Sequence, residues 1–159
     1  MDFKIKKITK NDKAWVNEVI NHWGADFVIT CGRKVYPADL PGFYAEDETS
    51  KRLGLVTYEI TGDQCEAVTL DAFERFKGVG TALMDRVDEA AREAGCKRLW
   101  FITTNDNLEA IRFYMRRGYT IAAVHINALE YSRKLKPSIP KIGNFGIPMR
   151  DEIEFEKFL

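Results

Sequence analysis

The sequence predicts a mixed α/β (α+β) fold, with a mainly antiparallel, twisted sheet and helices on both faces. The first half contains short segments in which apolar and polar residues alternate, with polar turn residues between them. After residue 80 the apolar spacing becomes helical, and strand-like and helix-like segments then succeed one another. At 159 residues the chain has the usual size of one domain, so we expect residues 1–159 to form a single unit.

The first half opens with a strand and a helix. Residues 3–8 alternate apolar and charged side chains, and residues 11–23 carry Trp15, Val19, Ile20 and Trp23 at helical spacing. An irregular stretch then leads to strands expected at residues 42–46, 52–61 and 65–73. Three successive strands with short turns form an antiparallel meander.

The second half alternates helices with strands. Residues 80–94 place apolar side chains on one helical face, and residues 98–104 form a continuous apolar run, as expected for a strand covered on both faces. Asn105 and Asp106 are capping residues for a helix that ends at Gly118, with Glu109 completing a capping box for Asp106. Strands are expected next at residues 119–126 and, to close the sheet, at residues 153–159, and the crossovers between successive strands should run parallel and right-handed.

Composition excludes several classes of function. The 24 Lys and Arg residues balance the 24 Asp and Glu residues, so we expect neither a nucleic-acid partner nor an anionic membrane partner. We find no apolar run long enough to span a bilayer and no signal peptide, which favours a cytoplasmic protein. The three widely spaced cysteines indicate a reducing compartment, and His22 and His125 are too few and too far apart to predict a metal site.

A glycine-containing segment between a strand and a long helix carries the strongest chemical signal. It consists of Arg75, Phe76, Lys77, Gly78, Val79, Gly80 and Thr81. Glycines let the backbone approach a ligand closely, and the free amides at a helix start suit a phosphate. A Rossmann fingerprint would need glycine at Leu83, and the spacing of a P-loop is absent. The segment therefore predicts either a pyrophosphate cradle of another kind or only a tight turn.

Two motifs about thirty residues apart resemble the signature segments of the GNAT superfamily of acyl-CoA-dependent N-acyltransferases. The first is RxxGxG, formed by Arg75, Gly78 and Gly80. The second is NxxAxxFYxxxGY, formed by Asn107, Ala110, Phe113, Tyr114, Gly118 and Tyr119. The order of elements from residue 3 to 126 also resembles the fold of that family, so the resemblance covers most of the chain.

The resemblance implies acetyl-CoA as co-substrate and assigns residues to it. The backbone of Arg75–Thr81 is expected to bind the pyrophosphate, and the strand around Val68 and Leu70 is expected to pair with the pantetheine arm. That strand and the strand at residues 98–104 are expected to splay apart, so that the amides of the cofactor satisfy their unpaired backbone groups. Asn107 matches a position that often contacts the cofactor arm.

The resemblance also implies direct attack of an amine on the thioester. Tyr114 matches the tyrosine near the cofactor sulfur and is our candidate acid for the thiolate, with a purely packing role as the alternative. Glu66 is our candidate base, because strand alternation should place it on the side of Val68 and Leu70, with a solvated edge carboxylate as the alternative. Asp71 and Asp106 are weaker candidates for the base, and Asp106 is more simply a helix cap.

The predicted activity is transfer of an acetyl group from acetyl-CoA to a primary amine, either a small molecule or a peptide. A non-catalytic acyl-CoA-binding or regulatory module is one alternative, and an acyltransferase for a longer acyl chain is another. The sequence does not identify the amine.

Residues 127–150 are longer than the short turn that usually joins the last two strands in the family. Their prolines and apolar residues favour order over disorder, so we expect an ordered excursion with Asn144 and Phe145 at its tip. It is expected either to form a wall of the amine pocket or to pack on a second subunit of a homodimer.

Overall fold

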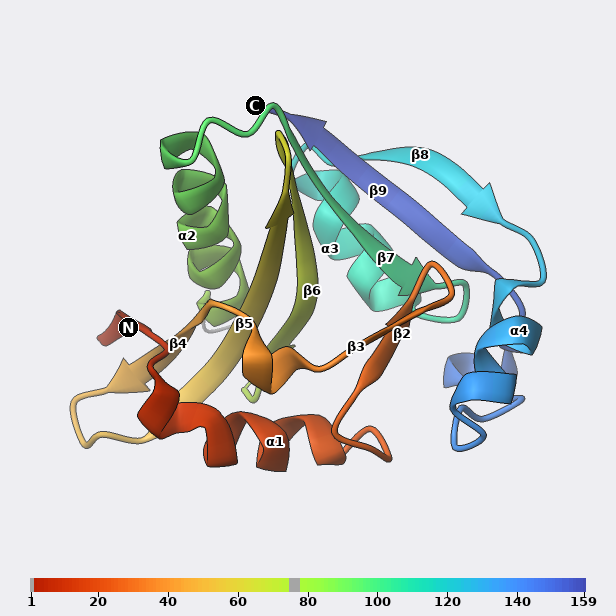
Figure 1. Cartoon of the computed structure of the whole chain (residues 1–159), viewed down its shortest axis with the longest axis horizontal. Coiled ribbons are helices and arrows are strands. Elements are labelled where there is room, and N and C mark those ends of the chain that lie inside the picture. The colour runs from red at the N-terminus through yellow and green to blue at the C-terminus, as the bar shows by residue number, and fades with distance from the viewer. Residues whose placement is uncertain (1, 75–77) are drawn as a thin grey trace.

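The computed structural model describes residues 2–74 and 78–159, and the predicted fold class is confirmed (Figure 1). Seven strands form one sheet in the order β1-β4-β5-β6-β7-β9-β8, and β2 and β3 form a separate hairpin. The strands are β1 (Phe3–Lys7), β2 (Val28–Thr30), β3 (Arg33–Val35), β4 (Gly42–Asp47), β5 (Arg52–Thr61), β6 (Gln64–Ala72), β7 (Arg98–Thr104), β8 (Thr120–His125) and β9 (Glu152–Phe158). The helices are α1 (Lys13–Asn21), α2 (Val79–Glu93), α3 (Leu108–Arg116) and α4 (Ala128–Leu135).

Pairing in the large sheet is antiparallel except between β6 and β7. The expected meander is formed by β4, β5 and β6, and the α2 crossover joins the parallel pair. The closing strand β9 lies between β7 and β8 and is antiparallel to both. β8 therefore runs in the same direction as β7 without being its neighbour.

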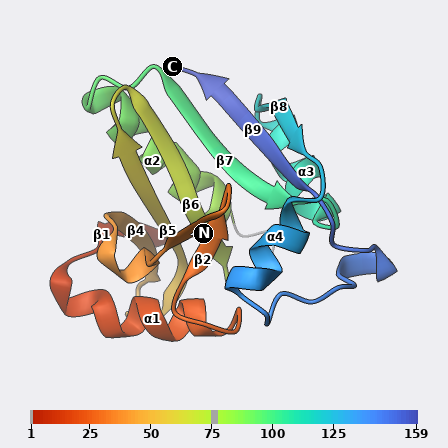
Figure 2. The ribbon, with the colours of Figure 1, turned by 45° about the vertical axis from the view of Figure 1, so that its right-hand side comes forward.

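Helices cover both faces of the sheet (Figures 1 and 2). The larger core lies under α2 and α3, where Leu83, Val87 and Tyr114 pack against buried strand residues such as Leu99 and Phe155. A smaller cluster joins α1 to the opposite face through Val16, Val19, Ile20 and Leu55. The helices α1 and α2 thus bury the apolar stripes that their sequences predict.

The strands β6 and β7 pair over only a short distance. Their three pairs are Gln64↔Arg98, Cys65↔Leu99 and Glu66↔Trp100, although both strands continue beyond them. Figures 1 and 2 show the two strands diverging toward the loop that precedes α2. We call residues 67–72 of β6 together with residues 101–104 of β7 the splayed interval. The backbone edges that face each other across it are not joined by any described β-ladder.

The two segments without a clear sequence pattern contain secondary structure. The irregular stretch after α1 holds the β2–β3 hairpin, which crosses in front of the sheet (Figure 1). The excursion before β9 holds α4 and an antiparallel bridge between Ile142 and Pro148. Order was expected in the second segment, but neither element was predicted from the sequence.

The structure corrects the expected cap of α3. Asn107 is the N-cap, and its Oδ1 accepts the backbone N–H of Ala110 at 3.3 Å. Asp106 instead accepts a hydrogen bond from the Thr104 hydroxyl at 2.5 Å and another from the backbone N–H of Asn144 at 2.9 Å. The Asp106 side chain therefore fastens the excursion rather than capping the helix.

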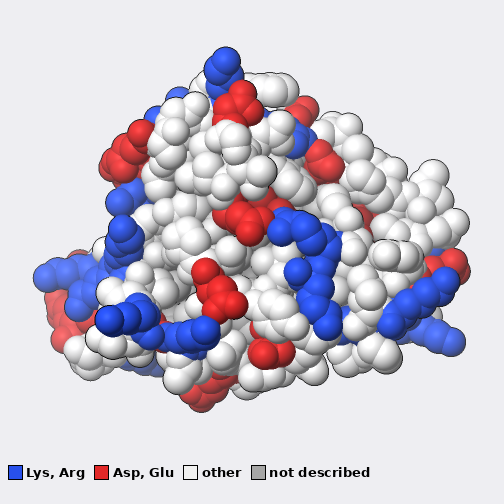
Figure 3. Space-filling model, in the orientation of Figure 1, with Lys and Arg blue, Asp and Glu red and all other residues white. Residues whose placement is uncertain are grey.

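None of the helices in the described residues has the length and apolar character that a bilayer crossing requires. On the face viewed in Figure 3, basic and acidic side chains lie interspersed, in keeping with the balanced charge of the sequence.

Candidate active site

The candidate site lies where β6 and β7 part. Glu66 forms the last β6–β7 pair, so its side chain stands at the point where the splayed interval begins. The expectation that Glu66 shares a side with Leu70 is wrong. Glu66 pairs with Glu59 and Leu70 pairs with Val56, and a register shift between Thr57 and Tyr58 leaves Val68 as an extra residue on β6. This β-bulge reverses the alternation and turns Glu66 to the face that carries α1 and the β2–β3 hairpin.

Glu66 is a buried carboxylate, and its side chain contacts the hairpin. Its Oε2 accepts a hydrogen bond from the Thr30 hydroxyl at 2.5 Å, and its Oε1 lies 3.1 Å from Nη2 of Arg33. Burial raises the pKa of Glu66, and the bonds from Thr30 and Arg33 act in the opposite sense. A carboxylate with a raised pKa is a stronger proton acceptor than a solvated one, so the alternative of a solvated edge residue does not describe Glu66.

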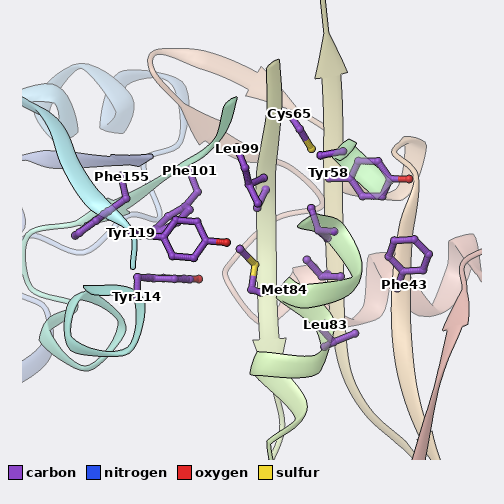
Figure 4. Close-up of a cluster of buried hydrophobic side chains, with 14 of the residues drawn as sticks. Phe43, Tyr58, Cys65, Leu83, Met84, Leu99, Phe101, Tyr114, Tyr119 and Phe155 are labelled. Atoms are coloured by element: carbon purple, nitrogen blue, oxygen red, sulfur yellow. The ribbon is translucent and has the colours of Figure 1, made fainter. Parts of the chain in front are cut away.

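Tyr114 lies on the opposite face, in the core beneath α2 and α3. Its ring packs against Phe101, with the centroids 3.9 Å apart, and against Tyr119, with the centroids 5.8 Å apart. Figure 4 shows the hydroxyls of Tyr114 and Tyr119 pointing toward Met84. Burial raises the pKa of Tyr114, so the phenol keeps its proton and can donate a hydrogen bond, although it is a weaker acid than a solvated tyrosine.

The start of α2 has the backbone geometry that an anion site requires. Gly78 is the N-cap, and its φ of 76° lies in the left-handed region that favours glycine. The N–H groups of the first helical turn, which includes Val79, Gly80 and Thr81, have no partners within the helix. The predicted ligand residues Arg75, Phe76 and Lys77 lie outside the described residues.

Arg117 is a residue of this region that sequence reasoning missed. Its Nε donates to the Thr81 hydroxyl at 2.9 Å, its Nη1 donates to the Phe113 carbonyl at 3.0 Å, and its guanidinium stacks 3.6 Å from the centroid of the Phe113 ring. These contacts hold a positive charge beside the N-terminus of α2, where it adds to the helix dipole. Its position directly before Gly118 in the second motif was the available signal.

Asn107 lies beside the splayed interval but has structural partners of its own. Besides capping α3, it donates from Nδ2 to the Thr103 hydroxyl at 3.3 Å. Val68 and Leu70 lie on the unpaired edge of β6, as the expected pantetheine contact requires. The cofactor roles of Val68, Leu70 and Asn107 stay predictions.

Asp71 is a second carboxylate on the same face of the sheet as Glu66. Asp71 pairs with Leu55 and Glu66 pairs with Glu59. Leu55 and Glu59 lie on the same face of β5 because an even number of positions separates them. Burial raises the pKa of Asp71 from 3.8 to about 6, and hydrogen bonding to the Trp23 side chain opposes that rise. The structure also places its charge near Tyr114. Of the two weaker candidates for the base, Asp71 therefore faces the same side of the sheet as Glu66, while Asp106 serves the excursion.

The excursion is fastened next to the start of α3. Asn105 donates from Nδ2 to the Pro148 carbonyl at 2.9 Å, and its Oδ1 accepts the N–H groups of Arg150 and Asp151, each at 3.0 Å. Gly143 packs so closely on Asp106 that an added Cβ would lie 2.1 Å from Asp106 Oδ2. The tip residue Phe145 is 70% exposed.

A sequence model described as the acetyltransferase (GNAT) family matches residues 14–119. The uncharacterized protein YdhI of Bacillus subtilis (strain 168) is 46% identical over 140 residues, which cover 87% of this chain and 86% of YdhI.

Solved structures share the fold at low identity. An IAA acetyltransferase from Bacillus cereus ATCC 14579 superposes with a TM-score of 0.73 at 19% identity, covering 99% of this chain and 100% of its own. A GNAT family acetyltransferase from Elizabethkingia anophelis, solved with acetyl-CoA bound, gives a TM-score of 0.70 at 18% identity, covering 99% of both chains. These likenesses confirm the architecture, and the family model covers both sequence motifs.

Proposed function

Because the chain belongs to the GNAT acetyltransferase family, we propose that it transfers the acetyl group of acetyl-CoA to a primary amine by direct attack in a ternary complex. The predicted family is thereby confirmed, and the amine, the mechanism and the residue roles are our proposal. The acceptor is a small molecule or a peptide.

One observation carries the proposal: the splayed interval has a buried carboxylate on one face and a protonated phenol on the other. Glu66 stands on the hairpin side where β6 and β7 part, and Tyr114 lies in the core on the α2 and α3 side. A thioester held in the splayed interval has its carbonyl open to an amine from the hairpin side and its sulfur near the phenol. This division matches the two proton transfers that amide formation requires.

The residues then have distinct roles. The neutral amine nitrogen attacks the thioester carbonyl carbon, and Glu66 takes the proton that the nitrogen loses. An N–H group on the unpaired edge of β6 stabilises the oxyanion that forms. As the carbon–sulfur bond breaks, the thiolate takes its proton from Tyr114. The products are the acetylated amine and free coenzyme A, and exchange with solvent then removes the proton from Glu66 and returns one to the Tyr114 phenolate.

The rest of the cofactor follows the backbone. The pantetheine amides pair with the unpaired edge of β6 around Val68 and Leu70, as an added strand would. The pyrophosphate binds the N–H groups at the start of α2, with Arg117 close by. Thr81 lies in the same turn.

The test is a thiol-release assay with purified protein, acetyl-CoA and a panel of primary amines, amino acids and peptides. The proposal expects free thiol to appear only with an acceptor and the acetyl group to be recovered on that acceptor. Acetyl-CoA binding without thiol release from any amine would identify a non-catalytic acyl-CoA-binding module. Faster thiol release from a longer acyl-CoA than from acetyl-CoA would show that the enzyme uses the longer acyl donor.

A further inference from the structure

The turn of the β2–β3 hairpin is attached to two carboxylates from different strands. The Thr30 hydroxyl donates to Glu66 on β6, and the backbone N–H of the next residue, Cys31, donates to the carboxylate of Glu152 on β9. β6 and β9 flank β7 in the sheet, so the turn lies over β7 on the face of the proposed amine entry (Figures 1 and 2). Consecutive Cα atoms are about 3.8 Å apart, so Glu66 and Glu152 lie close to each other beneath one turn.

The carboxylates under and beside the turn differ in their partners. Glu66 is paired with Arg33, and Glu154 is paired with Arg98. Although burial acts in the opposite sense, Arg98 and His125 lower the pKa of Glu154. Two arginines thus compensate two of the carboxylates in this region, Glu66 and Glu154.

Glu152 lacks such compensation. It is 2% exposed, its Oε1 has no hydrogen-bond partner, and among the described residues no Lys or Arg forms an ion pair with it. Burial raises its pKa, and the N–H of Cys31 and the nearby His125 oppose that rise. A buried carboxylate oxygen without a donor is costly, so its presence beside a binding site indicates a ligand that supplies one.

The surroundings of Glu152 indicate what kind of ligand. Cys31 is exposed, His125 has a 40% exposed side chain, and their Sγ and ring nitrogen lie within 4.8 Å of each other and of a Glu154 carboxylate oxygen. The cluster is therefore polar, carries negative charge and opens to solvent at these two residues. An anionic ligand is disfavoured there, while a cation with several N–H donors matches the vacant oxygen.

We propose that the acceptor is an amine with a second positive charge and that the Glu152 carboxylate beneath the β2–β3 turn binds that second charge. The inference rests on the proposed N-acetyltransferase function and names its substrate class. One amino group lies at Glu66 for acetylation while the other, still an ammonium, donates to Glu152. A divalent metal is less well suited, because Arg98 already contacts Glu154 and repels a second cation of high charge.

The test compares two four-carbon amines, putrescine with two amino groups and butylamine with one. Isothermal titration of the protein saturated with coenzyme A is expected to give tighter binding of putrescine by about 10- to 100-fold, the range for a charged hydrogen bond. In the Glu152→Gln variant this ratio is expected to fall toward one. The matched control is Glu156→Gln, which removes a carboxylate from the same face of β9 and is expected to keep the ratio.

Equal affinities of the wild-type protein for the two amines would overturn the inference without any variant. A ratio that survives Glu152→Gln in a folded protein would overturn the role of Glu152. Stoichiometric zinc that is lost on Cys31→Ser would assign the cluster to a metal and overturn it as well. Preferential putrescine binding without thiol release from acetyl-CoA would instead support the cationic site and contradict the proposed transfer, so the two failures are distinguishable.

Discussion

Two side chains carry the proposed chemistry, and burial raises the pKa of both. For Glu66 the raised pKa strengthens the carboxylate as a base. For Tyr114 the raised pKa keeps the proton on the phenol and weakens it as an acid, so the proposed proton transfer depends on the charge that develops on the thiolate. The hydrogen bonds from Thr30 and Arg33 favour the ionised form of Glu66 and orient it toward the hairpin side.

Tyr114→Phe is expected to lower turnover about 100- to 10,000-fold, the range for loss of general acid catalysis. The ring packs on Phe101 and Phe155, and Phe retains these contacts, so the fold and the affinity for acetyl-CoA should change little. Single-turnover thiol release and equilibrium binding of acetyl-CoA separate the two effects. Full single-turnover rate in the variant would reduce Tyr114 to a packing residue.

Asp71 gives a prediction about stability and pH. Its folded-state pKa of about 6 exceeds the ordinary 3.8, so between these values the folded state binds more protons than the unfolded chain. Stability due to Asp71 therefore falls as pH rises through this window and stays low at neutral pH. Asp71→Asn is expected to stabilise the fold by about 2 kcal/mol at pH 7 and by much less near pH 4.

Thermal or urea unfolding at the two pH values measures this difference. The Trp23 side chain donates equally well to an amide oxygen, so the substitution keeps that partner. A variant that is less stable than the parent protein at pH 7 would show that the ionised carboxylate is compensated in the folded state.

At the scale of elements, the start of α2 is the proposed pyrophosphate site. Gly78→Val is expected to abolish the rise in melting temperature on addition of acetyl-CoA, because the side chain covers the amides and the left-handed φ strains the loop. Gly95→Val is the matched control: Gly95 has a φ of 79°, and like Gly78 it has no atom within 4 Å of an added Cβ. Both variants lose intrinsic stability, and only Gly78→Val should lose the response to acetyl-CoA.

The excursion is the second element that can be tested. Shortening residues 138–148 to a brief linker removes the contacts to Asp106 and Asn105 beside the start of α3. If the excursion is a wall of the amine pocket, the affinity for the amine falls while acetyl-CoA binding is kept. Dissociation of a dimer would identify a subunit interface instead. Unchanged amine affinity and unchanged mass in solution would contradict both roles.

The sequence predicted elements wherever a period extends over several residues. The strand and helix at the start, the meander, α2, β7 and β9 lie close to their expected positions. The short helix α4 was missed because it spans only eight residues and lies in a segment that its prolines and glycines led us to interpret as irregular. The bulge at Val68 was missed because nothing in the β6 sequence specifies it, and it depends on the register with β5.

The residues of the candidate site likewise include some that the sequence predicted and some that it did not. Gly78, Glu66 and Tyr114 were identified from motifs and strand position, and the structure places them around the splayed interval. Arg117 and Glu152 were not identified, because each matters through a residue distant in sequence, Thr81 for the first and Cys31 for the second. Contacts between residues so distant in sequence form only in the folded chain, and no local sequence pattern predicts them.

At the scale of the whole molecule, the proposed function uses the two faces of one sheet. In this proposal the N-terminus of α2 and the core around Tyr114 serve the cofactor on one face, and the β2–β3 hairpin and the carboxylates beneath it serve the amine on the other. The acetyl group would pass between the faces where β6 and β7 diverge. Direct transfer is the mechanism that we expect, because both substrates would reach the splayed interval together.

Direct transfer is tested by acetyl-CoA labelled in its acetyl group. Protein incubated with labelled acetyl-CoA alone and then denatured is expected to carry no label, and addition of an accepted amine is expected to move the label to that amine in a single turnover. Label retained on the denatured protein, or label that reaches no amine in the panel, would contradict direct acetyl transfer between the two faces.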